Sequence, residues 1–248
     1  SIKDSIYSQE NRDQIAMQVA KNEFDKVRFK DNLKLERQKT FTYIGLAGVL
    51  LLLGFSFFIV KERRKSEKLL LNILPSDVAA ELKQKGVIKA RHFDHVTVLF
   101  TDFVNFTTAS EKMSPQALID ELHTCFKAFD EITAKYGIEK IKTIGDAYLA
   151  VSGLPIANAA HAENMVKAAI EINAFMRERL ARPGTGTFAM RIGLHSGSVV
   201  AGVVGMRKFA YDIWGDTVNT AARMEQNSEA GRINISAATY ELVKDKFD

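Results

Sequence analysis

The chain has 248 residues, of which 46% are hydrophobic and 26% are charged, so it can bury a core in one or two domains. Four prolines and fifteen glycines are too few for a collagen-like or a wholly disordered chain. One cysteine and five scattered histidines exclude an internal disulfide, a zinc finger and an iron–sulfur cluster. We expect the cysteine, Cys125, to be a buried helical thiol.

Many of the basic residues behind the net charge of +4 cluster in two segments, 21–39 and 61–68, on either side of one apolar run. This placement indicates a membrane surface, because anionic lipid headgroups attract juxtamembrane lysine and arginine. Aromatic side chains are not interleaved with the basic ones in the manner that stacks bases, so we do not expect a nucleic-acid partner.

The apolar run, residues 41–60, contains no charged residue. An α-helix of this length spans about 30 Å, the thickness of the hydrocarbon core of a bilayer. Apolar side chains on every face and charges at both ends favour a membrane helix over a buried core helix. The run begins too far into the chain for a signal peptide, and no small-residue cleavage site follows it. We therefore predict a single transmembrane helix in a cell membrane, with the lipid bilayer as a partner.

Neither the charges beside this helix nor the residues before it give its orientation. Six lysine and arginine residues lie within fifteen residues before the helix and five within fifteen after it, so the positive-inside rule favours neither side.

Residues 1–40 are charge-rich and carry apolar side chains at helical spacing, such as Ile15 and Val19. They begin without Met or an export signal, so we interpret them as the helical remnant of a larger sensor region. A free amphipathic tail is the alternative.

The pattern of residues 61–90 predicts two helices between the membrane and a soluble domain. The first continues from the apolar run until Pro75 interrupts it, and the second ends at Gly86, a residue type that often terminates helices. Such a segment is suited to mechanical coupling, although a plain spacer has the same pattern.

From residue 91 onward the pattern is that of a mixed domain. A buried strand at 95–102 precedes a helix at 114–137, and Gly145–Asp146 separates the two strands of a hairpin. After a helix at 158–180 we expect a second hairpin that turns at His195–Gly197, with His195 as a turn residue. The remaining predicted elements are a strand at 208–214, a helix at 215–226, a strand at 232–236 and a helix at 237–246. Adjacent hairpins between helices predict an α+β sandwich and not a doubly wound parallel sheet.

Two aspartates end apolar strands of this domain. Asp102 follows a buried strand and Asp146 lies at the tip of the first hairpin. In a ferredoxin-like sheet these strands are neighbours, so the two carboxylates can converge. With Lys142 and Arg207 nearby, they suit a divalent cation and a polyphosphate, since hard cations take oxygen ligands. Taken alone, each aspartate is better explained as a strand-end cap or a turn former.

A second group lies on the helix that starts near Asp216. Asn219 and Arg223 are four residues apart, so they project from one face of this helix. An amide and a guanidinium on one face can hold a sugar oxygen and a phosphate. A solvated polar stripe is the alternative.

The sequence resembles the class III nucleotidyl cyclases of bacterial membranes in four long segments, which follow one another in the family's order: LFTDFVNFTT, IEKIKTIGDAYLAVSGLP, MRIGLHSGSVVAGVVG and AYDIWGDTVNTAARME. The segment LLNILPSDVAAELK is similar to the coupling helix that precedes the family's catalytic domain. The resemblance covers Ser66 to Asp248 and implies a ferredoxin-like βαββαβ catalytic domain.

For the phosphate end of the substrate, the resemblance implies two Mg²⁺ or Mn²⁺ ions per site. Asp102 and Asp146 match the aspartates that bind these ions, with help from the Phe103 carbonyl. Phe106 and Thr107 match positions whose backbone N–H groups hold the triphosphate.

Three further side chains match residues that act on the nucleotide. Arg207 is similar to the arginine that contacts the β- and γ-phosphates, Asn219 to the residue that orients the ribose, and Arg223 to the one that stabilises the transition state. Because the family places each site between two chains arranged head to tail, the resemblance implies a homodimer with two equivalent sites.

Lys142 and Asp212 match the positions that recognise the purine, and Ile213 and Trp214 follow as further substrate-binding residues. Asp212 can accept from the adenine 6-amino group and Lys142 can donate to ring N1, whereas the family's guanylate cyclases carry Glu and Cys or Ser instead. The resemblance therefore implies an adenylate cyclase that converts ATP to 3′,5′-cyclic AMP and pyrophosphate. A guanylate cyclase and a catalytically silent relay domain are the alternatives.

The use of ATP places the domain after the membrane helix in the cytosol. The expected organisation is then an extracytoplasmic sensor remnant (1–40), a transmembrane helix (41–60), coupling helices (61–90) and a catalytic domain (91–248). Members of the family continue through another pair of strands, which carries a further triphosphate-binding lysine. We therefore expect the C-terminal strands of the domain to be missing from this chain.

Overall fold

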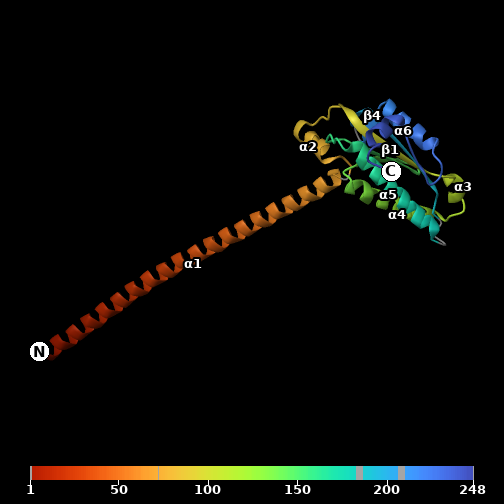
Figure 1. Cartoon of the computed structure of the whole chain (residues 1–248). Coiled ribbons are helices and arrows are strands. Elements are labelled where there is room, and N and C mark those ends of the chain that lie inside the picture. The colour runs from red at the N-terminus through yellow and green to blue at the C-terminus, as the bar shows by residue number, and fades with distance from the viewer. Residues whose placement is uncertain (1, 72, 183–186, 206–209, 248) are drawn as a thin grey trace. The chain divides into compact units, whose positions relative to one another are not determined.

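A computed structural model describes residues 2–71, 73–182, 187–205 and 210–247 of the chain. It divides into two compact units, Ser1–Glu67 and Lys68–Asp248. The first unit is a single helical segment, and the second contains the sheet with its covering helices (Figure 1). The two units are described separately below.

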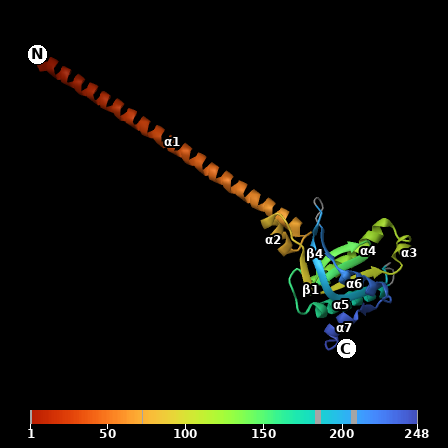
Figure 2. The same ribbon diagram turned by 90° about the horizontal axis from the view of Figure 1, so that it is seen from above.

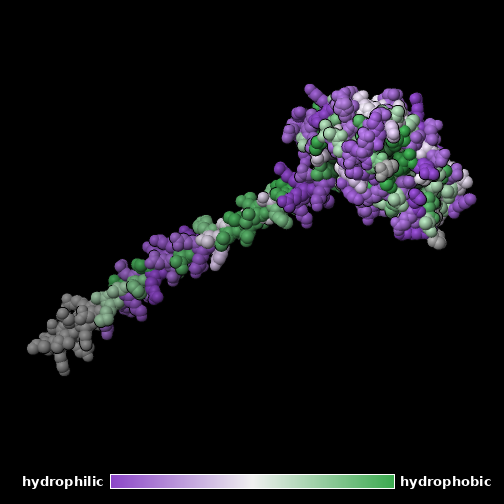
Figure 3. Space-filling model, viewed as in Figure 1, coloured by the Kyte–Doolittle hydropathy of each residue, from purple (hydrophilic) through white to green (hydrophobic). Residues whose placement is uncertain are grey.

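Helix α1, Ile2–Leu71, is continuous over 70 residues. The charge-free residues 41–60 lie within it, with no proline to interrupt the backbone hydrogen bonds. Their apolar side chains form the green band of the helix in Figure 3, and most of them are exposed. Among the described residues, this is the one helix that is long and apolar enough to cross a membrane, as judged by length and composition.

Helix α2, Ser76–Lys85, has the predicted boundaries. It follows Pro75 directly, and Gly86 ends it in the left-handed conformation, with φ of +68°, donating its N–H to the carbonyl of Leu82. Asp77 in the first turn and Lys85 in the last turn complement the helix dipole. The predicted break at Pro75 and the predicted stop at Gly86 are therefore both confirmed.

The second unit is built on one six-stranded sheet, as far as the described residues show, with the order β2-β3-β1-β4-β5 and with β6 beside β4. All pairs are antiparallel except β4 with β6. The strands are β1 (Arg91–Phe103), β2 (Glu139–Ile144), β3 (Ala147–Ser152), β4 (Met190–Val204), β5 (Ala210–Trp214) and β6 (Ile233–Ile235). The order of the first four strands is that of a ferredoxin-like βαββαβ unit, so the predicted α+β fold is confirmed.

Both faces of the sheet are buried, because alternate residues of its strands enter two different cores. On β1, Leu99 packs into one core and Val98 into the other. The first core lies beneath α4 (Pro115–Lys135), α5 (His161–Ala181) and α7 (Ala237–Val243). The second lies beneath α2 and α6 (Asp216–Gln226). Figure 1 and Figure 2 show α5 beside α4 and beside α7, respectively.

The expected second hairpin is wrong. Strand β4 runs without a turn through His195–Gly197 and pairs with β1 along most of its length. Two of its glycines, Gly193 and Gly197, instead allow helix α6 to pack closely against the backbone of the strand. A Cβ at Gly193 would overlap the backbone of Glu225, and a Cβ at Gly197 would lie 2.5 Å from Thr217 Oγ1.

His195 is consequently a strand residue and not a turn residue. Its Nδ1 lies 2.7 Å from Ser236 Oγ, at one end of a chain of hydroxyl groups that passes through Thr239 and Ser196 to Thr97. At the other end, Thr97 Oγ1 lies 2.7 Å from Nδ1 of a buried histidine, His161. This network satisfies buried polar atoms and joins α5 and α7 to the sheet.

Cys125 is fully buried in α4, as expected. Burial raises the pKa of its thiol to about 12, so the group stays protonated and unreactive at neutral pH.

We predict that Gly193→Ala lowers the free energy of unfolding by about 1–3 kcal/mol, because the new methyl group must displace the backbone of α6. Gly202→Ala on the same strand is the matched control, since its Cβ would lie at an ordinary 3.4 Å from Ala90. Urea denaturation of the full chain in detergent, followed by Trp214 fluorescence, measures both. Equal losses in the two variants would contradict the close approach as the cause.

Candidate functional site

Two carboxylates meet where β1 and the β2–β3 hairpin come together. Asp102 lies near the end of β1, and Asp146 follows Gly145, whose φ of +64° permits the tight turn. The pairing of β1 with β3, in which Thr101 lies opposite Tyr148, brings the two side chains into contact range. Burial raises the pKa of Asp146, and the negative charge of Asp102 raises it further. Two carboxylates so close together favour a bound cation, which would lower their mutual repulsion.

The residues present fit a divalent metal ion. Asp102 and Asp146 offer carboxylate oxygens, and the Phe103 carbonyl offers a third hard donor, which is the ligand chemistry of Mg²⁺ and Mn²⁺. Within the described ranges, groups of three or more His, Cys, Asp or Glu side chains that could enclose an ion are absent. Oxygens from water or phosphate would therefore have to complete the coordination, as is usual where Mg²⁺ acts on a polyphosphate.

Arg191 is a member of the site that the sequence analysis missed. It lies on β4 directly opposite Asp102, and its Nη2 is 2.9 Å from Asp102 Oδ2. Its Nε is 2.9 Å from Oε1 of Glu225, a buried residue of α6 whose pKa is raised by desolvation. A charged side chain within the apolar strand motif MRIGLHSG was the available signal, because such residues are rarely buried without a partner.

A second pair joins the two edges of the sheet. Lys142 on β2 and Asp212 on β5 belong to strands at opposite ends of the strand order, yet Lys142 Nζ lies 2.5 Å from Asp212 Oδ2. The sheet therefore curls until its edges meet. The backbone N–H of Ile213 donates to the other oxygen, Asp212 Oδ1, at 2.9 Å, which fixes the carboxylate. Ile213 is buried, whereas Trp214 is 41% exposed.

Asn219 and Arg223 lie four residues apart on α6, the helix that was expected to carry them, and both are exposed. In the part of the chain that the structure describes, no hydrogen bond or ion pair joins either side chain to the Asp102 or the Asp212 group. The face of α6 that carries these two side chains is therefore open to a ligand or to a second chain.

The predicted triphosphate-binding residues are only partly described. Phe106 and Thr107 begin the short helix α3, Phe106–Ser110, after Asn105, which adopts a left-handed conformation with φ of 57°. The first N–H groups of a helix have no acceptor within it, so this position suits an anion. Arg207 lies outside the described residues.

The chain was compared with known protein families. Residues 88–248 match the model of the adenylate and guanylate cyclase catalytic domain. The chain belongs to this family. The matched residues include all of the described strands of the sheet and the helices α4, α5, α6 and α7 that cover it.

Individual relatives include enzymes named for both purines. An adenylate cyclase of Mycobacterium tuberculosis is 40% identical over 187 residues, which is 75% of this chain and 42% of the relative. Atrial natriuretic peptide receptor 2 of the rat is 40% identical over 186 residues, 74% of this chain and 18% of the receptor. This chain therefore spans less than half the length of either relative. Overall similarity does not distinguish adenine from guanine.

The fold of the second unit also matches solved structures. The guanylate cyclase domain of RhGC from Catenaria anguillulae, crystallised in complex with GTP, superposes with a TM-score of 0.60 at 40% identity. The match covers 64% of this chain and 86% of that one.

We predict that Asp146→Asn raises the melting temperature of the second unit in metal-free buffer at pH 7. The pKa of Asp146 is raised, so its ionisation destabilises the folded state at pH values above this pKa, and the amide removes that penalty. The difference should disappear well below pH 3.8, the ordinary pKa of an aspartate, where the wild-type carboxyl is protonated in both folded and unfolded chains.

Asp120→Asn, which changes an exposed carboxylate of α4, is the control and should leave the melting temperature unchanged at both pH values. Calorimetry of the full chain in detergent gives all the required values. A lower melting temperature for Asp146→Asn at pH 7 would contradict the proposed repulsion.

Proposed function

We propose that this protein is a membrane-anchored adenylate cyclase, which converts ATP to 3′,5′-cyclic AMP and pyrophosphate. The observation that carries the choice of ATP is the contact between Lys142 and Asp212 at the meeting edges of the sheet. These are the two residues that the resemblance assigns to recognition of the base. They lie close enough to act on a single purine ring.

The chemistry of the pair supports adenine over guanine. An ammonium group can only donate hydrogen bonds and a carboxylate can only accept them. Adenine offers an acceptor at N1 and a donor at the 6-amino group, which complements both side chains. Guanine offers an N1–H donor and an O6 acceptor, so both contacts would be mismatched. Sites built on such hydrogen bonds can discriminate by up to about 10⁴–10⁵.

In the proposed reaction, the ribose 3′-oxygen attacks the α-phosphorus in line, a new O–P bond forms, and the bond to pyrophosphate breaks. Two Mg²⁺ or Mn²⁺ ions held by Asp102, Phe103 and Asp146 would lower the pKa of the 3′-hydroxyl and offset the charge of the phosphates. The work left to the protein is to position the substrate and to neutralise charge.

The remaining side chains have the following proposed roles. Asn219 orients the ribose and Arg223 stabilises the charge that develops at the α-phosphate, for which an exposed face of α6 is suitable. Loss of Arg223 should reduce the rate by about 10²–10³, as for other positioned donors. The N–H groups of Phe106 and Thr107 and the side chain of Arg207 hold the triphosphate, while Ile213 and Trp214 border the base.

We also propose that the active form is a head-to-tail homodimer in a cell membrane. Each chain carries both the aspartate pair and the residues of α6, so two copies can complete two equivalent sites. The apolar residues 41–60 would cross the membrane once and place the catalytic domain in the cytosol, where ATP is available. Residues 1–40 would then continue into a sensor region on the other side.

The test of the proposed function is product formation from labelled ATP and GTP, side by side, with Mg²⁺ and with Mn²⁺. We expect cyclic AMP from ATP and little cyclic GMP, and we expect Asp102→Ala to abolish the product. Cyclic GMP as the main product would favour the guanylate cyclase. Absence of product from a chain extended past Asp248 would favour the catalytically silent relay domain.

We predict that Lys142→Glu combined with Asp212→Cys shifts the preference from ATP towards GTP, because the two positions then offer the hydrogen-bonding groups that guanine requires. The ratio of kcat/KM for the two nucleotides measures the shift. Each single variant serves as a control and should lose ATP activity without gaining GTP activity. An unchanged preference for ATP in the double variant would contradict the assignment of the pair.

A further inference from the structure

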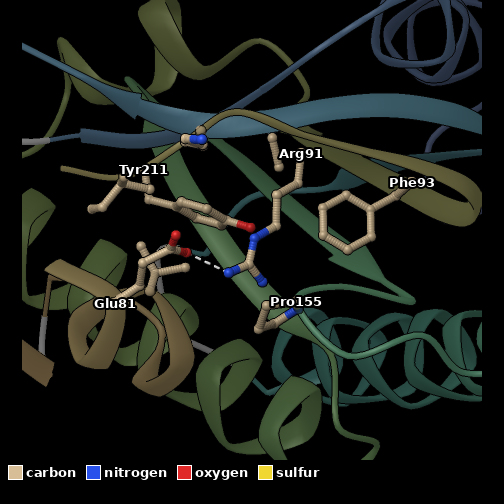
Figure 4. A pocket seen from close by; sticks show the side chains of 10 residues that line it. Glu81, Arg91, Phe93, Pro155 and Tyr211 are labelled. Atoms are coloured by element: carbon tan, nitrogen blue, oxygen red, sulfur yellow. Dashed lines mark hydrogen bonds and ion pairs between the residues drawn. The ribbon is translucent and has the colours of Figure 1, made fainter. Parts of the chain in front are cut away.

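A small cavity lies between α2, the beginning of β1 and strand β5. Its volume is about 10 Å³, enough for one water molecule. The cavity is lined by charged and aromatic side chains as well as apolar ones, and Arg91 reaches it from the surface, with 47% of its side chain exposed. Figure 4 shows the main ones: Glu81, Arg91, Phe93, Pro155 and Tyr211.

Glu81 connects α2 to the sheet through a charge pair. It is only 9% exposed, and its Oε2 accepts a hydrogen bond from Arg91 Nη2 at the first residue of β1. Its other oxygen accepts from Lys85 Nζ at 3.2 Å, on the solvent side of the helix. A carboxylate buried to this extent is stable only while it is paired, so the Arg91 contact holds this part of α2 in place.

Tyr211 connects the same charge pair to strand β5. It is 8% exposed, and in Figure 4 its ring lies beside the guanidinium of Arg91. Tyr211 shares a core with Val78 and Ala79 of α2, so both polar and apolar contacts join the helix to this strand.

The next residue along β5 is Asp212. Because side chains of a strand alternate between its faces, Tyr211 and Ile213 point into the core beneath α2 while Asp212 points the other way, towards Lys142. The backbone between Tyr211 and Ile213 therefore sets the position of the Asp212 carboxylate. Movement of Tyr211 by a fraction of an ångström would be transmitted to the hydrogen bond with Lys142.

We infer that Glu81, acting through Arg91 and Tyr211, is a positioning residue for the base-recognition pair Lys142–Asp212. The inference rests on the proposed function, since it assigns a role within the same site. Helix α2 thereby becomes part of the substrate-recognition apparatus, although none of its residues contacts the pair. A change at α2 alters which nucleotide is accepted, and how tightly, more than it alters the chemical step.

The test is Glu81→Gln in the full chain in detergent, which removes the charge and keeps the shape. We expect KM for ATP to rise about tenfold, and we expect the preference for ATP over GTP to fall by a similar factor. A change of about tenfold corresponds to the loss of one well-placed charge-assisted hydrogen bond to the base. The kcat with ATP should change by less than about threefold, because the phosphate-binding groups lie on other elements.

Trp214 gives a second readout that does not depend on activity. It is the only tryptophan of the chain, follows Asp212 by two residues, and lies beside Gly202, which also lines the cavity. We expect Glu81→Gln to change its emission maximum and its quenching by acrylamide. Lys85→Gln, which removes the solvent-side partner of the same carboxylate, is the matched control and should leave KM, preference and emission unchanged within twofold.

Arg91→Gln should reproduce the effect of Glu81→Gln, and the double variant should be no worse than either single one, because the two residues act as one pair. If Glu81→Gln does not fold, Glu81→Asp keeps the charge with a shorter reach and should give the same pattern at smaller scale. The inference would be overturned if Glu81→Gln lowered kcat while KM for ATP and the preference for ATP over GTP stayed constant. It would also be overturned if Glu81→Gln lost this preference while the emission of Trp214 stayed unchanged. If the wild type makes no cyclic AMP, the proposed function fails, whereas the emission of Trp214 still shows whether Glu81 positions β5.

Discussion

The repulsion between Asp102 and Asp146 is the constraint on which much of the second unit depends. Strand pairing forces the two carboxylates together, so other groups must compensate for their charge. Arg191 pairs with Asp102 from the neighbouring strand, and Glu225 pairs with the other side of the same guanidinium. Since Glu225 belongs to α6, the compensation of one aspartate also orients the helix that carries Asn219 and Arg223.

The curl of the sheet is the second organising feature. Alternating burial places one core beneath α4, α5 and α7 and another beneath α2 and α6. The same curl brings Lys142 to Asp212. Helix α2, a short helix outside the ferredoxin-like unit, packs in the second core with Tyr211 and Ile213, the neighbours of Asp212 on β5.

Much of the architecture was predictable because local signals were strong. Pro75 and Gly86 bounded α2, and the Gly145–Asp146 turn was identified correctly, since apolar strands flank it closely on both sides. Strand β4 was misassigned because a glycine inside an apolar run has two explanations, a turn or a close approach of another backbone. Only the position of α6 decides between them.

The residues of the candidate site also differ in how well local sequence predicts that they meet. Asp102 and Asp146 were expected to meet because strands β1 and β3 are neighbours in the predicted sheet. Lys142 and Asp212 were matched to the family, but strand order alone places them at opposite edges, and only the curvature of the sheet brings them together. Arg191 was overlooked because its partners are far away in the sequence, 89 and 34 residues distant.

The glycines of β4 determine which substitutions this part of the second unit can accept. At Gly193 and Gly197, helix α6 packs directly on the backbone of the strand, so a side chain at either position would meet the helix. The Lys142–Asp212 contact, in contrast, depends on side chains at the edges of the sheet. A larger residue at Gly193 or Gly197 would therefore displace a whole helix, whereas a substitution at Lys142 or Asp212 changes one side-chain contact between the edges of the sheet.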